Sequence, residues 1–317
     1  MEKTKSVVLV GTGPMAVEYA KVLKDQKIFV VVVGRGEESA KKFTEETGLE
    51  VSTGGIDNWL AGNSLFPRKA IIAVSEDQLG VVTLKLLNSG FKDILVEKPG
   101  GKNSEDMIRV ARAAKKHSAK VCLGYNRRFY ASVIEGQKII TKDGGVTSFN
   151  FEFTEWSHVI ADLKKAPGIK NEWFLHNSTH IIDLAFFLGG EPRKISSYTS
   201  GGLNWHKRAS VFAGSGQTKK GALFSYQANW EAPGRWGVEI LTKKHRLILK
   251  PLEKLQIQNI GSVAVGEVKI GDKLDLKYKP GLYNQIKFFL SGQTKDFCSI
   301  EEQVKNLKIY KVIGDIK

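Results

Sequence analysis

The chain has 317 residues, 42% of them hydrophobic and 26% charged, which is enough for two domains with substantial cores. Its longest apolar run, Ile28 to Val33, is far too short to span a bilayer, and its two cysteines are too few for a disulfide framework. Because the first five residues lead directly into a strand pattern, we expect no signal peptide and a reduced, cytoplasmic protein.

The net charge of +15 is spread over short basic pairs such as Lys41-Lys42 and Lys243-Lys244. No dense basic helix, zinc-ligand set or aromatic RNA-binding motif accompanies these pairs, so we predict no nucleic-acid partner. We interpret the charge as a lysine-rich surface. Its positive field would also attract anionic small molecules such as dinucleotides and nucleotide-sugars.

The first predicted element is a buried strand, Val7–Val10, which runs into a glycine turn and then a helical pattern. Gly11 permits the tight turn, Gly13 lets the backbone approach a pyrophosphate, and small Ala16 lets the helix pack on the strand. The free N–H groups at the helix start face the anion. We therefore assign the turn to the cofactor site, through residues Gly11, Gly13, Pro14 and Met15.

Strands and helices alternate through the rest of the first third. The predicted strands are residues 28–33, a short one near 51, 70–74, 94–96 and 121–124; the predicted helices are 38–47, 79–90 and about 104–117. This alternation predicts a parallel, doubly wound sheet whose ligands lie beyond the carboxyl ends of the strands. We divide the chain into a Rossmann dinucleotide-binding domain, residues 1–124, and a second domain, residues 125–317, to which the family resemblance given below assigns substrate binding and oligomerisation.

The end of the second strand bears on the choice of cofactor. An acid there would bind the ribose 2′-hydroxyl, whereas an arginine accommodates a 2′-phosphate. Arg35 stands at this position, with no carboxylate before Glu37, so the sequence favours NADP, with NAD as the alternative. Ser75 and Gln78, which follow the 70–74 strand, are further cofactor candidates, although they also suit a helix cap.

Three further motifs carry a family resemblance. Glu97-Lys98-Pro99 ends a strand, Gly124-Tyr125-Asn126-Arg127-Arg128-Phe129 follows, and His180-Ile181-Ile182-Asp183 precedes Leu188-Gly189-Gly190. With the glycine turn, they resemble the Gfo/Idh/MocA family of glucose–fructose oxidoreductase and inositol dehydrogenase. The resemblance implies a C-terminal α/β domain with an open, mostly antiparallel sheet, often a homo-oligomer interface. It also implies reversible oxidation of a sugar or cyclitol hydroxyl by a nicotinamide.

The resemblance implies a catalytic role for Lys98, with Glu97 beside the cofactor, and an acid/base or substrate-positioning role for His180. A lysine at a strand end can stabilise the substrate alkoxide and take part in proton transfer. The chain departs from the family pattern four residues before that histidine, where the family often has Asp and this sequence has His176. His176 either binds substrate or exchanges protons in place of the acid, or the activity is altered or lost.

The second half reads as strands separated by turns, with few helices. The strands are predicted at residues 147–153, 195–200, 210–213, 222–229, 237–242, 246–250 and 254–258, and the helices at 131–141, 178–188, 281–291 and 300–313. If the 176–183 segment is helical, His176, His180 and Asp183 share a face, but with no third-ligand motif we predict no metal site. The predicted substrate-binding residues are Asn126, Arg128, Trp156, Trp173, His176 and Tyr283.

The sequence therefore predicts an NAD(P)-dependent sugar dehydrogenase or ketoreductase, with a nucleotide-sugar as one candidate substrate. Two alternatives stay open. A protein that kept the fold but lost the acid/base set would be a non-catalytic NAD(P)-binding sensor or partner protein. An NAD-dependent glycosidase would use the same residues with no net change of cofactor.

Overall fold

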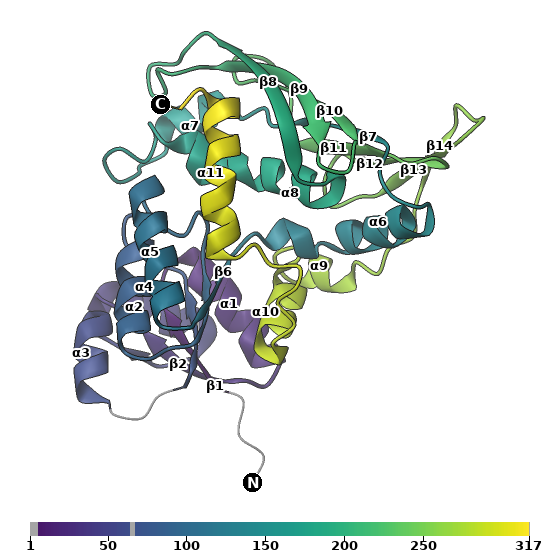
Figure 1. Ribbon diagram of the computed structural model, residues 1–317. Coiled ribbons are helices and arrows are strands. Elements are labelled where there is room, and N and C mark those ends of the chain that lie inside the picture. Colours follow the sequence, from purple (N-terminus) through teal and green to yellow (C-terminus); the bar gives the residue numbers. More distant parts are fainter. Residues whose placement is uncertain (1–5, 64–66, 317) are drawn as a thin grey trace. The chain divides into compact units, whose positions relative to one another are not determined.

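The computed structural model describes residues 6–63 and 67–316 (Figure 1). The chain forms two compact units: the first runs to Tyr125 and includes Leu282–Lys305, and the second comprises Asn126–Gly281 and the residues from Asn306 onward. The first boundary lies beside the division predicted after residue 124. The grouping of residues 282–305 with the first unit is not apparent from the sequence. Within the described ranges, no helix is both long and apolar enough to cross a membrane.

The first unit is built on a six-stranded parallel sheet. Its strands are β1 (Ser6–Val10), β2 (Phe29–Val33), β3 (Val51–Ser52), β4 (Lys69–Ile72), β5 (Asp93–Val96) and β6 (Lys120–Leu123). They pair in the order β3-β2-β1-β4-β5-β6 with every ladder parallel. This is the strand order typical of dinucleotide-binding sheets, so the predicted doubly wound sheet is confirmed.

Five of the described helices of this unit alternate with its strands, and two more come from the C-terminal part of the chain. They are α1 (Pro14–Asp25), α2 (Glu37–Thr47), α3 (Gly55–Gly62), α4 (Leu79–Asn88), α5 (Ser104–Lys116), α10 (Leu282–Ser291) and α11 (Ile300–Gly314), the last of which continues into the second unit. Local sequence explains their ends: Gly48 ends α2 in the left-handed conformation, and the Asn103 side chain accepts from the Asp106 N–H to cap α5. Helix α10 packs against α1.

The second unit carries an eight-stranded sheet. Its strands are β7 (Ser148–Glu152), β8 (Pro192–Ser200), β9 (Val211–Thr218), β10 (Leu223–Asn229), β11 (Gly237–Leu241), β12 (His245–Leu249), β13 (Gln256–Asn259) and β14 (Val265–Glu267). The order is β14-β13-β12-β11-β7-β10-β9-β8, and only the β7–β10 pair is parallel. The predicted mostly antiparallel sheet is therefore confirmed.

The helical segments of this unit are η1 (Asn126–Phe129), α6 (Ala131–Lys142), α7 (Ser157–Asp162), η2 (Phe174–Ser178), α8 (Thr179–Gly189) and α9 (Lys273–Lys277). Helix α8 covers one face of the sheet (Figure 1). Its Phe186 meets the rings of Phe149 and Phe224 edge-on, at centroid distances of 6.0 and 5.2 Å. A side chain at Gly189 would overlap the Phe149 ring, so this glycine allows the close packing of α8 on β7.

Candidate functional site

The glycine turn after β1 has the features that a dinucleotide needs. Gly11 has a φ of +124°, and a Cβ there would lie 2.1 Å from the Ala73 carbonyl oxygen, so only glycine fits. Gly13 is exposed and has open space where a Cβ would stand. No side chain among the described residues caps the start of α1 at Pro14, which leaves its first N–H groups, beginning with that of Met15, available to an anion. A pyrophosphate group fits this turn.

The two glycines allow a matched test. We expect Gly11→Ala to destabilise the protein by about 1–3 kcal/mol, because the new methyl group meets backbone in a strained conformation. Gly13→Val should leave the thermal midpoint unchanged and weaken dinucleotide affinity about tenfold or more, because its side chain occupies the approach of the pyrophosphate. Thermal unfolding and cofactor titration of both variants check this. Wild-type affinity in Gly13→Val would contradict the assignment.

A cation and two hydroxyl groups gather at the end of β2. Arg35 is exposed and lies two residues past the end of this strand. Thr12 Oγ1 donates to Ser39 Oγ at 3.0 Å, and Ser39 Oγ donates to the Gly36 carbonyl oxygen at 3.0 Å. The sequence reasoning did not identify Thr12 or Ser39; a serine four residues after the arginine was the available signal. Such a combination of guanidinium and hydroxyl groups suits a phosphate monoester.

In the loop after β4, the polar groups of Gln78 form hydrogen bonds with other residues of the same loop. Gln78 Nε2 donates to Asp77 Oδ2 at 2.8 Å, and the Gln78 N–H donates to the Ser75 carbonyl oxygen at 2.9 Å. The Gln78 hydrogen bond is the main cause that lowers the pKa of Asp77, and the positive charge of Arg35 acts in the same direction. Ser75 itself is exposed. The cofactor roles of Ser75 and Gln78 therefore stay predictions.

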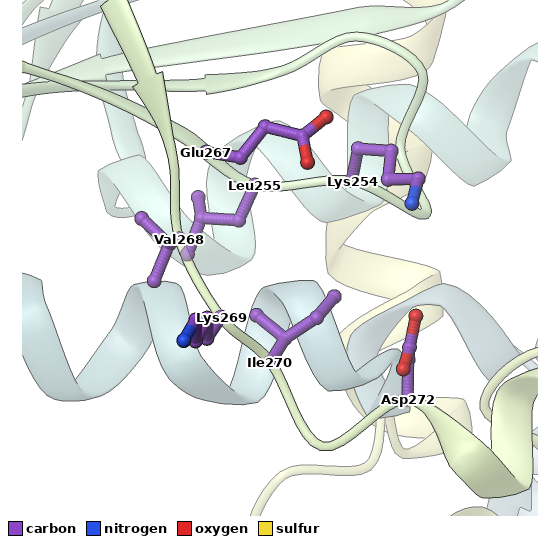
Figure 2. A pocket seen from close by; sticks show the side chains of 7 residues that line it. All are labelled: Lys254, Leu255, Glu267, Val268, Lys269, Ile270 and Asp272. Carbon is purple, nitrogen blue, oxygen red and sulfur yellow. The ribbon is translucent and has the colours of Figure 1, made fainter.

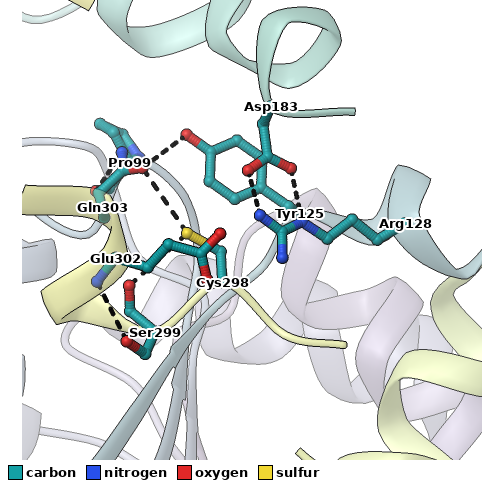
Figure 3. A network of polar contacts seen from close by, with 8 residues as sticks. All are labelled: Pro99, Tyr125, Arg128, Asp183, Cys298, Ser299, Glu302 and Gln303. Atoms are coloured by element: carbon teal, nitrogen blue, oxygen red, sulfur yellow. Dashed lines mark hydrogen bonds and ion pairs between the residues drawn. The ribbon is translucent and has the colours of Figure 1, made fainter. Parts of the chain in front are cut away.

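The Glu97-Lys98-Pro99 turn after β5 is held on both sides of the lysine. Glu97 Oε1 accepts from the Tyr19 hydroxyl of α1 at 2.8 Å. On the other side, Gln303 Nε2 donates to the Pro99 carbonyl oxygen at 3.3 Å, and Gln303 Oε1 accepts from the Tyr125 hydroxyl (Figure 3). Lys98 is half-buried between these anchors. Its backbone position is thus fixed at the same sheet edge as the glycine turn.

Tyr19 is a site residue that the sequence reasoning missed in this role. Its side chain is fully buried, and burial, together with the negative charge of Glu97, raises the pKa of its hydroxyl well above the usual value. The hydroxyl lies 3.4 Å from Gln285 Oε1 of α10. A neutral Tyr19 therefore acts as a hydrogen-bond donor that holds the Glu97 carboxylate.

In the second unit, the predicted site residues His176 and His180 lie on a continuous helical segment. Residues 174–178 form a single π turn, and α8 continues from Thr179. His176, His180 and Asp183 are all buried. Local π turns occur frequently at functional sites. The helical segment is as predicted, whereas the catalytic roles of His176 and His180 stay predictions.

Asp183 forms a buried ion pair with Arg128 (Figure 3). Arg128 Nε donates to Asp183 Oδ2 at 2.8 Å and Nη2 donates to Oδ1 at 2.6 Å, a bidentate arrangement in which both side chains are at least 97% buried. Asn126 Nδ2 donates to the Pro280 carbonyl oxygen at 2.9 Å. Both predicted substrate-binding residues thus make structural contacts within the unit, and their contact with substrate stays a prediction.

A group of aromatic and cationic side chains lies beside His180; we call Arg127, Trp156, Arg235 and Trp236 the Trp236 cluster. The His180 ring lies 6.0 Å from the ring of Trp236. The guanidinium of Arg235 stacks on Trp156 and Trp236, at 4.5 and 4.8 Å from their ring centroids, and that of Arg127 lies 4.6 Å from Trp236. Trp156 is exposed and was predicted; the other three members were not.

A buried carboxylate lies next to this cluster. Glu155 accepts from Asn177 Nδ2 at 2.9 and 3.1 Å and from the Ser178 hydroxyl at 2.8 Å. Burial raises the pKa of Glu155, and these hydrogen bonds and the charge of Arg235 oppose the rise. The η2 segment is therefore tied to the segment that precedes α7.

The remaining two predicted substrate residues lie elsewhere. Trp173 is buried and packs edge-on against Trp205, which stacks on Trp230, so it belongs to an aromatic part of the core. Tyr283 lies on α10 in the first unit, and its carbonyl oxygen accepts from Gln26, just past the C-terminal end of α1. That is the opposite end of α1 from the glycine turn. Neither environment favours a sugar-binding role, which stays a prediction.

A cavity of about 330 Å³ lies beside the β13–β14 hairpin of the second unit (Figure 2). It is lined by Lys254, Leu255, Glu267, Val268, Lys269, Ile270 and Asp272. None of the predicted site residues is among them, so we assign no role in the reaction to this cavity.

Known proteins resemble this chain in fold over nearly its whole length, whereas a family model matches only its first part. No curated protein sequence matches the chain significantly. Among solved structures, levoglucosan dehydrogenase in complex with NADH and L-sorbose is 17% identical, with a TM-score of 0.78 over 98% of this chain and 96% of that one. UDP-N-acetylglucosamine 3-dehydrogenase from Acidithiobacillus ferrooxidans is 15% identical, with a TM-score of 0.76 over 98% and 97%.

An oxidoreductase from Agrobacterium radiobacter, in complex with NAD+, L-tartaric acid and magnesium, is 12% identical, with a TM-score of 0.77 over 98% and 95% of the two chains. These likenesses show that the fold is shared over nearly the whole chain. Residues 5–125 match the model of an oxidoreductase family with an NAD-binding Rossmann fold. The resemblance to the Gfo/Idh/MocA oxidoreductases predicted from the sequence is confirmed, over this matched region, by that family's model.

Proposed function

We propose that the protein is an NAD(P)-dependent dehydrogenase or ketoreductase acting on a hydroxyl or keto group of a sugar. The observation that carries the proposal is the pairing of two turns at one edge of the parallel sheet. The uncapped glycine turn follows β1, and the anchored Glu97-Lys98-Pro99 turn follows β5. Ligands of such sheets bind beyond the carboxyl ends of the strands.

The bound nicotinamide would supply the hydride acceptor or donor. Lys98 would hold the reacting oxygen, because its ammonium group stabilises an alkoxide and can exchange a proton with it. His180 would bind the substrate and exchange protons near neutral pH, with His176 in the place of the family's usual acid. Glu97 would keep the lysine turn in position through Tyr19.

The sugar substrate is supported by the names of two similar proteins, levoglucosan dehydrogenase and UDP-N-acetylglucosamine 3-dehydrogenase. The second makes a nucleotide-sugar one candidate here, and the net charge of +15 would favour it. The test is to incubate the purified protein with NADP+ or NAD+ and a broad panel of sugars and nucleotide-sugars, and to follow nicotinamide reduction. Cofactor binding without turnover of any compound would favour the sensor alternative. Glycoside cleavage without net cofactor change would favour the glycosidase.

NADP is the proposed cofactor, on account of Arg35 and the neighbouring hydroxyl groups of Thr12 and Ser39. We expect Arg35→Asp to weaken NADPH binding about tenfold or more, since a lost charge-assisted contact and a new repulsion act together, and to spare NADH. Fluorescence titration of both cofactors measures this. Lys41→Asp, an exposed charge change on α2, is the matched control. Equal affinity of the wild type for both cofactors would remove the proposed preference.

We further propose a homo-oligomer formed through the open face of the eight-stranded sheet. Two apolar side chains are prominent among the exposed residues of its strands: Tyr198 on β8 is 75% exposed and Leu223 on β10 is 59% exposed. Light scattering of the purified protein tests the association. We also propose a reduced, cytoplasmic location on the basis of cysteine usage: the chain has two cysteines, Cys122 and Cys298, and both are buried.

A further inference from the structure

Two adjacent arginines of η1 have different electrostatic surroundings. Arg128 is neutralised by Asp183. Within the described part of the chain, Arg127 has no carboxylate partner: its Nη1 reaches Asn126 Oδ1 at 3.3 Å, and its buried Nε donates to no described atom. A guanidinium in such a place is costly unless an acceptor completes its hydrogen bonds.

Burial lowers the pKa of the Arg127 guanidinium, and the like charge of Arg235 lowers it further. The nearby acidic groups of Tyr130, Glu253 and Glu155 act in the opposite direction. Arg235 is exposed and stacks on the indoles of Trp156 and Trp236. Among the described residues it forms no ion pair. The two guanidinium carbons lie 4.6 and 4.8 Å from the same ring centroid, that of Trp236.

Trp236 adds a third donor. Its side chain is 95% buried, and its indole N–H has no hydrogen-bond partner among the described residues. Buried donors in folded proteins are nearly always satisfied, so this N–H is available to an acceptor outside the described residues. Two acceptors next to cluster members in the sequence are engaged by other donors: Glu155 accepts from Asn177 and Ser178, and the Gly234 carbonyl oxygen accepts from Trp156.

We propose that Arg127, Arg235 and Trp236 form a subsite for an anionic group of the substrate, a carboxylate or a phosphate. An anion would satisfy both kinds of orphaned donor and relieve the repulsion between the two guanidinium groups, whose planar forks suit these oxygens. The subsite adjoins His180 and so rests on the proposed function, which it narrows to sugars that carry a negative charge. Arg235, as the exposed member, would meet the anion first.

The test follows the indole N–H resonance of Trp236, assigned by Trp236→Phe, during titrations without nicotinamide. Glucuronate and glucose 6-phosphate represent the two anions, and glucose is the neutral control. We expect a saturable shift with one or both anions and affinity about tenfold or more above that of glucose. Arg235→Gln should weaken anion binding about tenfold and leave glucose binding unchanged. Arg127→Gln should do the same if it folds, and Arg193→Gln, an exposed change on β8, should have no effect.

The comparison of glucuronate with glucose 6-phosphate distinguishes the two groups: the ligand that binds more tightly shows whether the subsite takes a carboxylate or a phosphate. The subsite is refuted if neither anion moves the resonance, if glucose binds as tightly, or if Arg235→Gln retains wild-type anion affinity. The proposed function fails separately. Anion binding with no oxidation of any sugar would keep the subsite and remove the enzyme, whereas turnover without charge preference would do the reverse.

Discussion

Replacing Lys98 by alanine is expected to lower the rate of hydride transfer by about 10²–10⁴-fold, the usual contribution of a positioned acid or base. Glu97 and Pro99, the residues on either side of Lys98, each form a hydrogen bond with another element. Removal of the lysine side chain should therefore leave the turn in place. Dinucleotide affinity should therefore survive, because the glycine turn after β1 is untouched. Single-turnover kinetics with a substrate found in the sugar panel, together with cofactor titration, measures both quantities.

His180→Ala is the companion variant, with the same expected loss and the same retention of cofactor. Lys102→Ala and His158→Ala serve as controls, since both of these side chains are exposed and belong to the same units as the residues they control for. Near wild-type turnover in both Lys98→Ala and His180→Ala would remove the proposed mechanism. A loss of cofactor binding in Lys98→Ala would instead make Lys98 a cofactor-holding residue.

Most of the fold was accessible from the sequence because its elements carry strong local patterns. β-Branched runs such as 30–33 predict buried parallel strands, and glycine or asparagine caps mark the ends of α2 and α5. The short helix α3 escaped because it has only 8 residues and both begins and ends with glycine, which is a poor helix former. The grouping of α10 with the first unit escaped for a different reason, since sequence periodicity gives a helix's buried face but not its partner.

The residues of the candidate site also fall into those that the sequence predicted and those that it did not. Motif residues such as Gly11 and Lys98 were accessible because a turn needs a particular residue type at a particular spacing. Tyr19, Gln303, Arg235 and Trp236 were not, because each acts through a contact with a residue distant in the sequence. Arg127 shows the limit most clearly: the motif places it beside Arg128, and only the structure separates the neutralised arginine from the other.

The second large expected effect concerns the Arg128–Asp183 ion pair and the free energy of unfolding. Both side chains are almost wholly buried, and the guanidinium also lies 4.6 Å from the centre of the Phe187 ring. Such a pair is not itself a large source of stability, because the cost of removing two charges from water offsets their attraction. Removing one partner is different, since the remaining charge stays buried without compensation.

We therefore expect Asp183→Leu or Arg128→Met alone to reduce the free energy of unfolding by about 3–5 kcal/mol. The double variant should recover most of that loss, because two apolar side chains can occupy the space without a buried charge. Urea denaturation of the four proteins in a double-mutant cycle measures the coupling. The exposed pair Arg246–Glu239 is the control, and Arg246→Met should cost less than about 1 kcal/mol. Equal losses in the single and double variants would mean that Arg128 and Asp183 stabilise the unit through separate contacts, and not as an ion pair.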